Sequence, residues 1–226
     1  MKIKFLGQNC FLFTYKNINI LSDPFYNYQK EESKFDISAQ KIDYVMITHA
    51  HEDHIADVKE VLENHPDAIL IGQPEICGYF KHPNFIDLNI GGSTNVEDLI
   101  ITMVSAAHTS SFPDGSYGGL ASGYFIRTPE QNIYLAGDTG LMSDMKEFIE
   151  WFGEISVAIL PIGGHYTMNA DDAALAAYEY LKTNKVIACH FDTFEKIEID
   201  HEETMEIFEE ANVELILPKL GEEIEV

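Results

Sequence analysis

The sequence is poor in cysteine, in basic residues and in long apolar runs, and each shortage excludes a class of protein. Its 226 residues contain three cysteines that lie far apart, which excludes a disulfide framework and predicts reduced, buried thiols. Lys and Arg total 14 against 38 Asp and Glu, so the net charge is −24. Phosphate backbones and anionic lipids favour clustered positive charge, and we therefore expect neither a nucleic-acid nor a membrane partner.

Other absences narrow the organisation of the chain and its chemistry. No apolar run approaches the roughly 20 residues that a membrane span needs, so we expect a soluble cytoplasmic protein. No Pro/Gly/Ser-rich linker or repeat is present, and 46% of the residues are hydrophobic, which predicts a single domain over residues 1–226. No Gly-x-Ser-x-Gly or P-loop pattern occurs, so nothing indicates a serine hydrolase or an ATPase.

Apolar periodicity predicts an α/β fold. Strands are predicted at 2–6, 10–15, 18–22, 44–48, 68–71, 85–88, 99–106, 120–127, 132–136, 155–160, 186–189 and 214–217. Helices are predicted at 54–63, 74–80, 144–152 after a Ser143 cap, 169–182 and 200–211. Strands at both ends, with helices after the central strands, predict two mixed sheets face to face with helices on their outer faces, a four-layer αββα sandwich.

The densest chemical signal is the segment His49-Ala-His-Glu-Asp-His54, which holds three histidines and an aspartate within six residues. It lies between a predicted buried strand and a predicted helix. Such a turn would direct His49 and His51 toward one point and Asp53 and His54 toward a second point close by. A single histidine here would be explained by ordinary packing, and an aspartate before a helix by capping. The cluster as a whole predicts a two-metal hydrolytic site.

Four further polar residues follow other predicted strands. Each alone has an ordinary explanation, as a turn aspartate or a packed histidine at a strand terminus. Together they indicate ligands gathered from successive strand ends, where a rigid scaffold holds loops over one edge. These residues are His108, Asp138, His165 and His190. His65, His82 and His201 fit no such pattern, and we expect them to be exposed to solvent.

On these residues the chain resembles the metallo-β-lactamase-fold superfamily. Residues 49–54 match the hallmark His-x-His-x-Asp-His in full, and the later His, the Gly137-Asp-Thr-Gly140 segment and the last His follow in the expected order. The segments 20–24, 160–168 and 190–194 resemble a compact family of uncharacterised metal-dependent hydrolases. That family is related to L-ascorbate-6-phosphate lactonase and to the phospholipase D that cleaves N-acyl-phosphatidylethanolamine. The resemblance covers nearly the whole chain and implies the metallo-β-lactamase fold.

The resemblance implies a ligand set for two metal ions. His49, His51 and His108 would hold the first ion, and Asp53, His54 and His190 the second. Asp138 would bridge the two ions. This nitrogen-rich set with two carboxylates suits zinc, and manganese, iron or nickel are alternatives. Two neighbouring residues have open roles: Asp23 either orients a ligand imidazole or forms a structural Asp-Pro turn, and Gln8 stands where relatives often have a histidine.

The expected reaction is hydrolysis of a small ester, lactone or phosphoester by a hydroxide that bridges two metal ions. Asp53 would help to orient the attacking water, and His165 is a candidate proton donor or substrate contact. Segment 109–119 is predicted to form one wall of the pocket, with Tyr166 and Met168 forming another. An iron-dependent oxidoreductase of the persulfide-dioxygenase type and a non-catalytic metal-binding protein are the alternatives. The substrate and the oligomeric state stay open.

Overall fold

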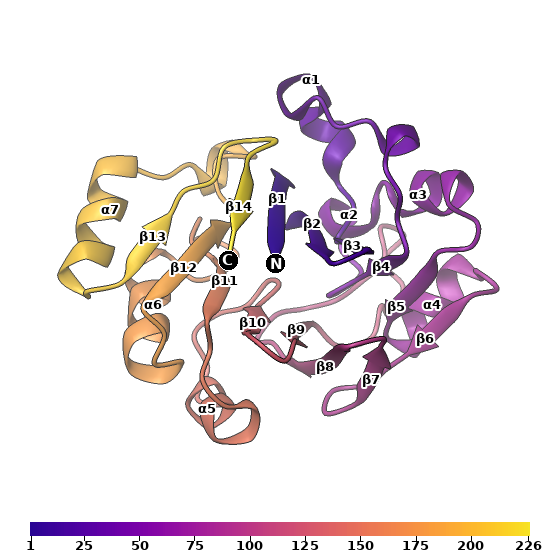
Figure 1. Ribbon diagram of the computed structural model, residues 1–226. Coiled ribbons are helices and arrows are strands. Elements are labelled where there is room, and N and C mark those ends of the chain that lie inside the picture. Colours follow the sequence, from indigo (N-terminus) through magenta and orange to yellow (C-terminus); the bar gives the residue numbers. More distant parts are fainter. The chain divides into compact units, whose positions relative to one another are not determined.

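The computed structural model describes residues 1–226 and divides the chain into two compact units. Unit 1 consists of Met1–Asn89, Thr109–Leu120 and Pro218–Val226, and unit 2 of Ile90–His108 and Ala121–Leu217. Each unit is built on one seven-stranded sheet that mixes parallel and antiparallel pairing (Figure 1).

The sheet of unit 1 has the strand order β14-β1-β2-β3-β4-β5-β6. Its strands are β1 (Lys2–Gly7), β2 (Cys10–Tyr15), β3 (Ile18–Ser22), β4 (Tyr44–Met46), β5 (Ile69–Gly72), β6 (Phe85–Asp87) and β14 (Glu223–Glu225). Pairing is antiparallel from β14 to β3 and parallel from β3 to β6. Strands β1, β3 and β4 therefore run in one direction, and the residues that follow them lie along one edge of the sheet.

Short helices connect and cover the strands of unit 1. They are η1 (Tyr26–Gln29), α1 (Lys30–Ser33), η2 (Ile37–Ala39), α2 (Glu52–Ile55), α3 (Val58–Asn64) and α4 (Pro74–Phe80). Val58 and Val61 of α3 and Ile76 of α4 pack in one buried apolar cluster with Leu21 and Leu70 of the sheet. This packing fixes the turn after β4, because α2 and α3 follow that turn directly.

The sheet of unit 2 has the order β13-β12-β11-β10-β9-β8-β7. Its strands are β7 (Ser93–Val96), β8 (Leu99–Ser105), β9 (Ser122–Arg127), β10 (Asn132–Leu135), β11 (Val157–Pro161), β12 (Lys185–Cys189) and β13 (Glu214–Ile216). Pairing is antiparallel from β7 to β10 and parallel from β10 to β13. Strands β8, β10, β11 and β12 thus end at the same edge.

The helices of unit 2 pack on its sheet through an apolar cluster. They are α5 (Met145–Phe152), α6 (Ala170–Leu175), the π-helical turn η3 (Ala176–Tyr180), η4 (Glu195–Ile197) and α7 (His201–Glu210). Phe148 of α5 and Phe208 of α7 are fully buried in a cluster with Tyr134 and Leu160 of the sheet. Asn169 and Asp200 cap α6 and α7, because each side chain accepts hydrogen bonds from backbone amides of the first turn.

The predicted α/β class, with two mixed sheets flanked by helices, is confirmed. Two local predictions are wrong, and a third helix is present with a change in its geometry. The helix predicted at 54–63 is two helices, α2 and α3, interrupted near Asp57, whose carboxylate accepts hydrogen bonds from Asn27. Ser143 does not cap α5: the cap position is Asp144, whose carboxylate accepts from Ser105 instead. The helix predicted at 169–182 changes from α to π geometry at Ala176.

The three cysteines are free and buried, as predicted. Burial raises the pKa of the Cys77 thiol to about 12, so this thiol stays protonated and unreactive at neutral pH.

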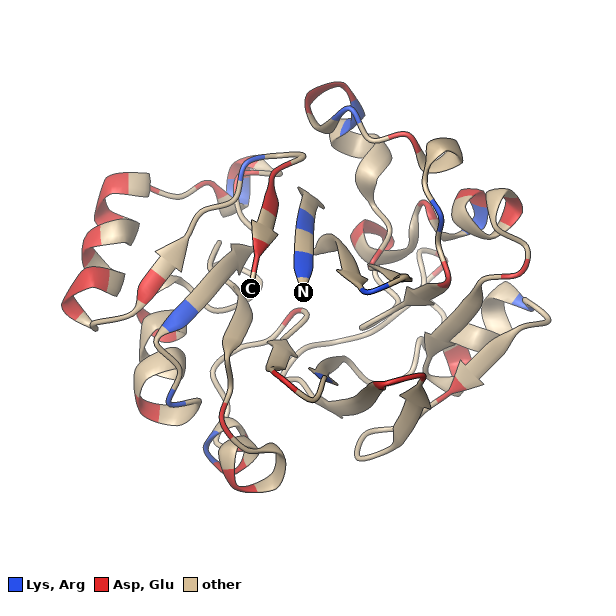
Figure 2. Cartoon of the chain, in the orientation of Figure 1, with Lys and Arg blue, Asp and Glu red and all other residues tan.

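Acidic residues are distributed over many elements, and α7 alone carries Glu202, Glu203, Glu206, Glu209 and Glu210 (Figure 2). No helix has both the length and the apolar character that crossing a bilayer requires.

Candidate metal centre

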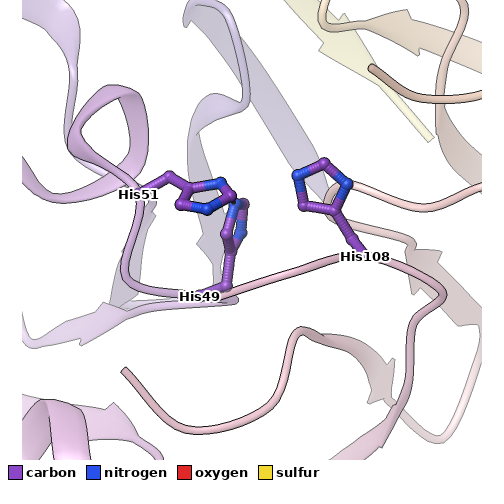
Figure 3. A group of neighbouring side chains, drawn as sticks. All are labelled: His49, His51 and His108. Atoms are coloured by element: carbon purple, nitrogen blue, oxygen red, sulfur yellow. Dashed lines mark hydrogen bonds between the residues drawn. The ribbon is translucent and has the colours of Figure 1, made fainter. Parts of the chain in front are cut away.

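In unit 1 the segment 49–54 begins three residues after the end of β4, at the edge where β1 and β3 also end. His49 is fully buried and His51 is partly exposed. Their rings lie edge to face, with Nε2 of His49 and Nδ1 of His51 3.0 Å apart (Figure 3). The opposite nitrogens contact hydroxyl groups: Thr48 Oγ1 is 3.1 Å from His49 Nδ1, and Thr109 Oγ1 is 3.5 Å from His51 Nε2. These contacts orient both imidazoles toward one point.

Asp53 and His54 form a second pair at the start of α2, where Asp53 Oδ2 lies 3.4 Å from His54 Nε2. The other nitrogen of His54, Nδ1, is 2.8 Å from Asp23 Oδ2, and both side chains are fully buried. Asp23 also accepts hydrogen bonds from the Thr48 backbone amide at 2.8 Å and the Thr48 hydroxyl at 2.7 Å. Burial raises the pKa of Asp23, and the His54 imidazole opposes that shift.

Asp23 therefore makes the contact with an imidazole that a role in orienting a ligand requires. A carboxylate on Nδ1 holds the imidazole in one orientation and leaves Nε2 directed toward Asp53. His54 and Thr48 lie on the segment after β4, whereas Asp23 follows β3. Asp23 thus ties two neighbouring strand ends together and positions His54 at the same time.

In unit 2 the carboxylate of Asp138 lies between two imidazoles. Asp138 Oδ2 is 3.5 Å from His108 Nε2 and 3.1 Å from His190 Nε2. The three residues follow β8, β10 and β12, which end at one edge of the sheet. Asp138 and His190 are buried, and His108 is partly exposed. The Ala107 amide donates to Thr139 Oγ1 at 2.9 Å, which fixes the loop of His108 against the loop of Asp138.

The spacing of these atoms fits a metal ion with tetrahedral coordination. Two donor atoms bound to one zinc ion at about 2.0–2.1 Å lie about 3.4 Å apart at the tetrahedral angle. The four pairs of candidate ligand atoms described above, one nitrogen–nitrogen pair and three nitrogen–oxygen pairs, are 3.0–3.5 Å apart. Two groups of residues could hold a metal ion: His49, His51 and His108, drawn in Figure 3, and Asp53, His54, Asp138 and His190. These two groups contain all seven residues that the sequence predicts as ligands. That these residues bind metal stays a prediction.

Comparison with known proteins assigns the chain to a family. The model of the beta-lactamase superfamily domain matches residues 18–191. A UPF0173 metal-dependent hydrolase of Christiangramia forsetii is 42% identical over 229 residues, covering 100% of both chains. This chain belongs to the UPF0173 metal-dependent hydrolase family. The family resemblance seen in the sequence is thereby confirmed.

Solved structures extend the comparison of this UPF0173 protein to the fold. Igni18, a metallo hydrolase of the archaeon Ignicoccus hospitalis, is 32% identical and superposes with a TM-score of 0.86 over 99% of this chain and 97% of its own. A metallo-beta-lactamase fold protein of Bacillus subtilis is 16% identical, with a TM-score of 0.78 over 99% and 98% of the two chains. The predicted metallo-β-lactamase fold is confirmed.

Two predictions about other side chains of the UPF0173 protein are wrong. His65 and His82 are half-buried rather than exposed, and each donates from Nε2 to a backbone carbonyl, at 3.1 and 2.7 Å. Met168 is fully buried in the core of unit 2 and so cannot line a pocket.

His165 is exposed on the loop after β11, with φ of 52° and its ring edge-on to Tyr166. Its role as proton donor or substrate contact stays a prediction.

Sequence reasoning left open the role of Gln8, whose side-chain amide donates to Asp53 Oδ2 at 2.8 Å. The signal that could have found this contact is the direction of the strands. Gln8 follows β1 and Asp53 follows β4, and these strands run the same way in one sheet. Polar residues after such strands meet at one edge, although these two are 45 positions apart in the chain.

Replacement of Asp23 by alanine is expected to destabilise the protein by about 3–5 kcal/mol, because it removes a fully buried carboxylate that accepts hydrogen bonds from Thr48 and His54. The Thr48 amide and hydroxyl would also lose their acceptor. Urea unfolding of the metal-free protein measures this loss. The matched control is Asp67→Ala at an exposed position of unit 1, for which we expect a change within about 0.5 kcal/mol. Equal stability of both variants would contradict the structural role of Asp23.

Proposed function

We propose that this UPF0173 protein is a dinuclear, predominantly zinc-dependent hydrolase of a small ester, lactone or phosphoester. The observation that carries the proposal is the pair of candidate ligand groups, one of three imidazoles and one of two imidazoles and two carboxylates, whose donor atoms have the spacing of metal ligands. The membership in a family named for metal-dependent hydrolysis supports it. We choose zinc as the metal because imidazole nitrogens and carboxylate oxygens are its usual ligands, and manganese, iron and nickel are alternatives.

The residues divide into two ligand sets under this proposal. His49, His51 and His108 hold the first ion, Asp53, His54 and His190 hold the second, and Asp138 contributes to both. The position of Asp138 Oδ2, within 3.5 Å of both His108 Nε2 and His190 Nε2, supports its assignment as the shared ligand.

Two metal ions, when bound, supply a hydroxide nucleophile at neutral pH and polarise the bond under attack. The chain itself supplies orientation. Thr48, Asp23 and Thr109 contact the outer nitrogens of His49, His54 and His51 and so fix which nitrogen of each ring is available. Asp53, held by Gln8, orients the attacking water. His165 is the candidate that gives a proton to the leaving group.

The charge of the chain restricts the substrate. A net charge of −24 repels polyanions, so a small substrate with little negative charge is favoured over a nucleic acid. Exposed Tyr117 and Leu120 on the segment 109–120 offer apolar surface in the loop that also contacts His51 through Thr109. Because this loop follows a proposed ligand directly, we assign it to the wall of the substrate pocket.

An activity screen tests the proposal. The purified protein is assayed against panels of lactones, phosphodiesters and thioesters, with Asp53→Ala prepared in the same way as the blank. We expect turnover of at least one compound class by the native protein and none by the variant. Absence of turnover on every panel, by protein shown to contain two metal ions, would favour a metal-binding protein without catalysis and contradict the proposal.

A further inference from the structure

Gln8 occupies the tight connection between β1 and β2, at the edge of the sheet of unit 1 where the proposed ligands lie. Its side chain is fully buried, and its amide nitrogen donates to Asp53 Oδ2 at 2.8 Å. An ionised carboxylate only accepts hydrogen bonds, so this contact requires the NH₂ group, rather than Oε1, to face Asp53. The orientation of the amide is therefore determined by its chemistry.

The environment of Gln8 is unfavourable for folding in two respects. Its Oε1 is buried without a hydrogen-bond partner. Its backbone has φ of 52°, in the left-handed region that a residue other than glycine adopts at a cost. The preceding Gly7 has φ of 114°, a backbone conformation that residues with a Cβ atom rarely adopt. Unfavourable backbone geometry and unpaired polar atoms concentrate at functional sites.

The hydrogen bond from Gln8 reaches the Asp53 oxygen that is placed to bind the proposed metal ion. The same oxygen, Oδ2, lies 3.4 Å from His54 Nε2, the spacing expected of two donors on one ion. Asp53 is partly exposed and lies on the four-residue helix α2. An aspartate carboxylate turns about two side-chain bonds, so a hydrogen bond to one of its oxygens restricts its orientation. The neighbouring His54 is held in a similar way, because its other ring nitrogen, Nδ1, contacts Asp23. Gln8 does for Asp53 what Asp23 does for His54.

We propose that Gln8 is a positioning residue that orients the Asp53 carboxylate toward the metal ion held by Asp53 and His54. The inference rests on the proposed function, because it assumes that Asp53 is a ligand. Gln8 itself does not contact substrate. Its amide is neutral and acts through Asp53, so its loss changes the affinity of one metal ion rather than the chemistry of the donors. Removal of such a partner of a ligand lowers metal affinity by about 10–100-fold.

Stepwise titration of metal-free protein with Zn²⁺ against a competing chelator tests this inference. Gln8→Met keeps the length and bulk of the side chain and removes the donor. We expect one of its two sites to lose about 10–100-fold in affinity, while the other site stays within about threefold of the native value. The matched control is Gln73→Met, a second buried glutamine of unit 1, whose Oε1 accepts from the Leu120 amide. Both Zn²⁺ constants of Gln73→Met should equal those of the native protein.

Unchanged Zn²⁺ constants in Gln8→Met would overturn the inference, and so would an equal loss at both sites, which would indicate general unfolding. Far-UV circular dichroism identifies the latter case. If the native protein itself binds fewer than two ions, the proposed function fails in that arm. Crystal structures of the metal-free native protein and Gln8→Met then decide the inference: it requires a different orientation of the Asp53 carboxylate in the variant, and an unchanged carboxylate overturns it.

Discussion

Replacement of Asp53 by alanine is expected to lower kcat/KM by about 10³-fold or more for whichever compound proves to be the best substrate. Under the proposed function, the variant loses a carboxylate ligand of the second metal ion and the group that orients the attacking water. Metal coordination and proton transfer each contribute several kcal/mol to such reactions, and one factor of ten corresponds to about 1.4 kcal/mol. Steady-state kinetics at saturating zinc measures the effect.

The loss should appear mainly in kcat, because Asp53 acts on the nucleophile and the metal rather than on substrate binding. The matched control is Asp67→Ala, which removes the same charge from an exposed position of unit 1. We expect this control to retain native kinetics within about twofold. A kcat of Asp53→Ala within tenfold of native, in protein that still binds metal, would remove Asp53 from the mechanism.

Removal of the metal ions is expected to lower Tm by about 8–16 °C. A ligand present at 1,000 times its Kd stabilises the native state by about 4 kcal/mol, and in a chain of this size 1 kcal/mol corresponds to about 2–4 °C. The physical reason is local. Fully buried His49 and His54 and almost fully buried Asp138 and His190 lose the ion that would neutralise and hold them together. Differential scanning calorimetry of native and chelator-treated protein measures the shift.

Re-addition of Zn²⁺ should restore both Tm and activity, which separates metal loss from damage by the chelator. His201→Ala provides a matched histidine control, because His201 is exposed and pairs with Asp192 on the surface of unit 2. Its metal-dependent shift should equal that of the native protein, whereas His54→Ala should show a smaller one. The same Tm with and without metal would exclude the buried histidines as ligands.

The sequence predicts the fold well where a strand is buried and long. Strands β2 and β3 have the predicted limits, because continuous apolar or alternating residues mark both ends. It fails for β7 and β14, the edge strands Ser93–Val96 and Glu223–Glu225. Their residues are mostly polar and exposed, and they are strands only because β8 and β1 offer partners for their backbone groups. Local periodicity carries no information about such pairing.

For the candidate site, the sequence predicts the metal-binding residues but not the contacts that support them. The motif at 49–54 and the strand-end residues His108, Asp138 and His190 predict a metal site, because so many imidazole groups at successive strand ends are typical of metal ligands. The supporting contacts depend on the direction of strands within the sheet. Gln8 meets Asp53 only because β1 and β4 run the same way, and Asp23 meets His54 only because β3 lies beside β4. Neither contact follows from spacing along the chain.

The most direct test of the account is the metal content of the protein purified without added metal. Mass spectrometry under native conditions, together with elemental analysis, gives both the number and the identity of the bound ions. The proposal predicts two divalent ions per chain, with zinc predominating, and fewer than two in Asp138→Ala because that residue is the shared ligand. One iron ion and no zinc per chain would contradict the hydrolase and favour an iron-dependent oxidoreductase on the same fold.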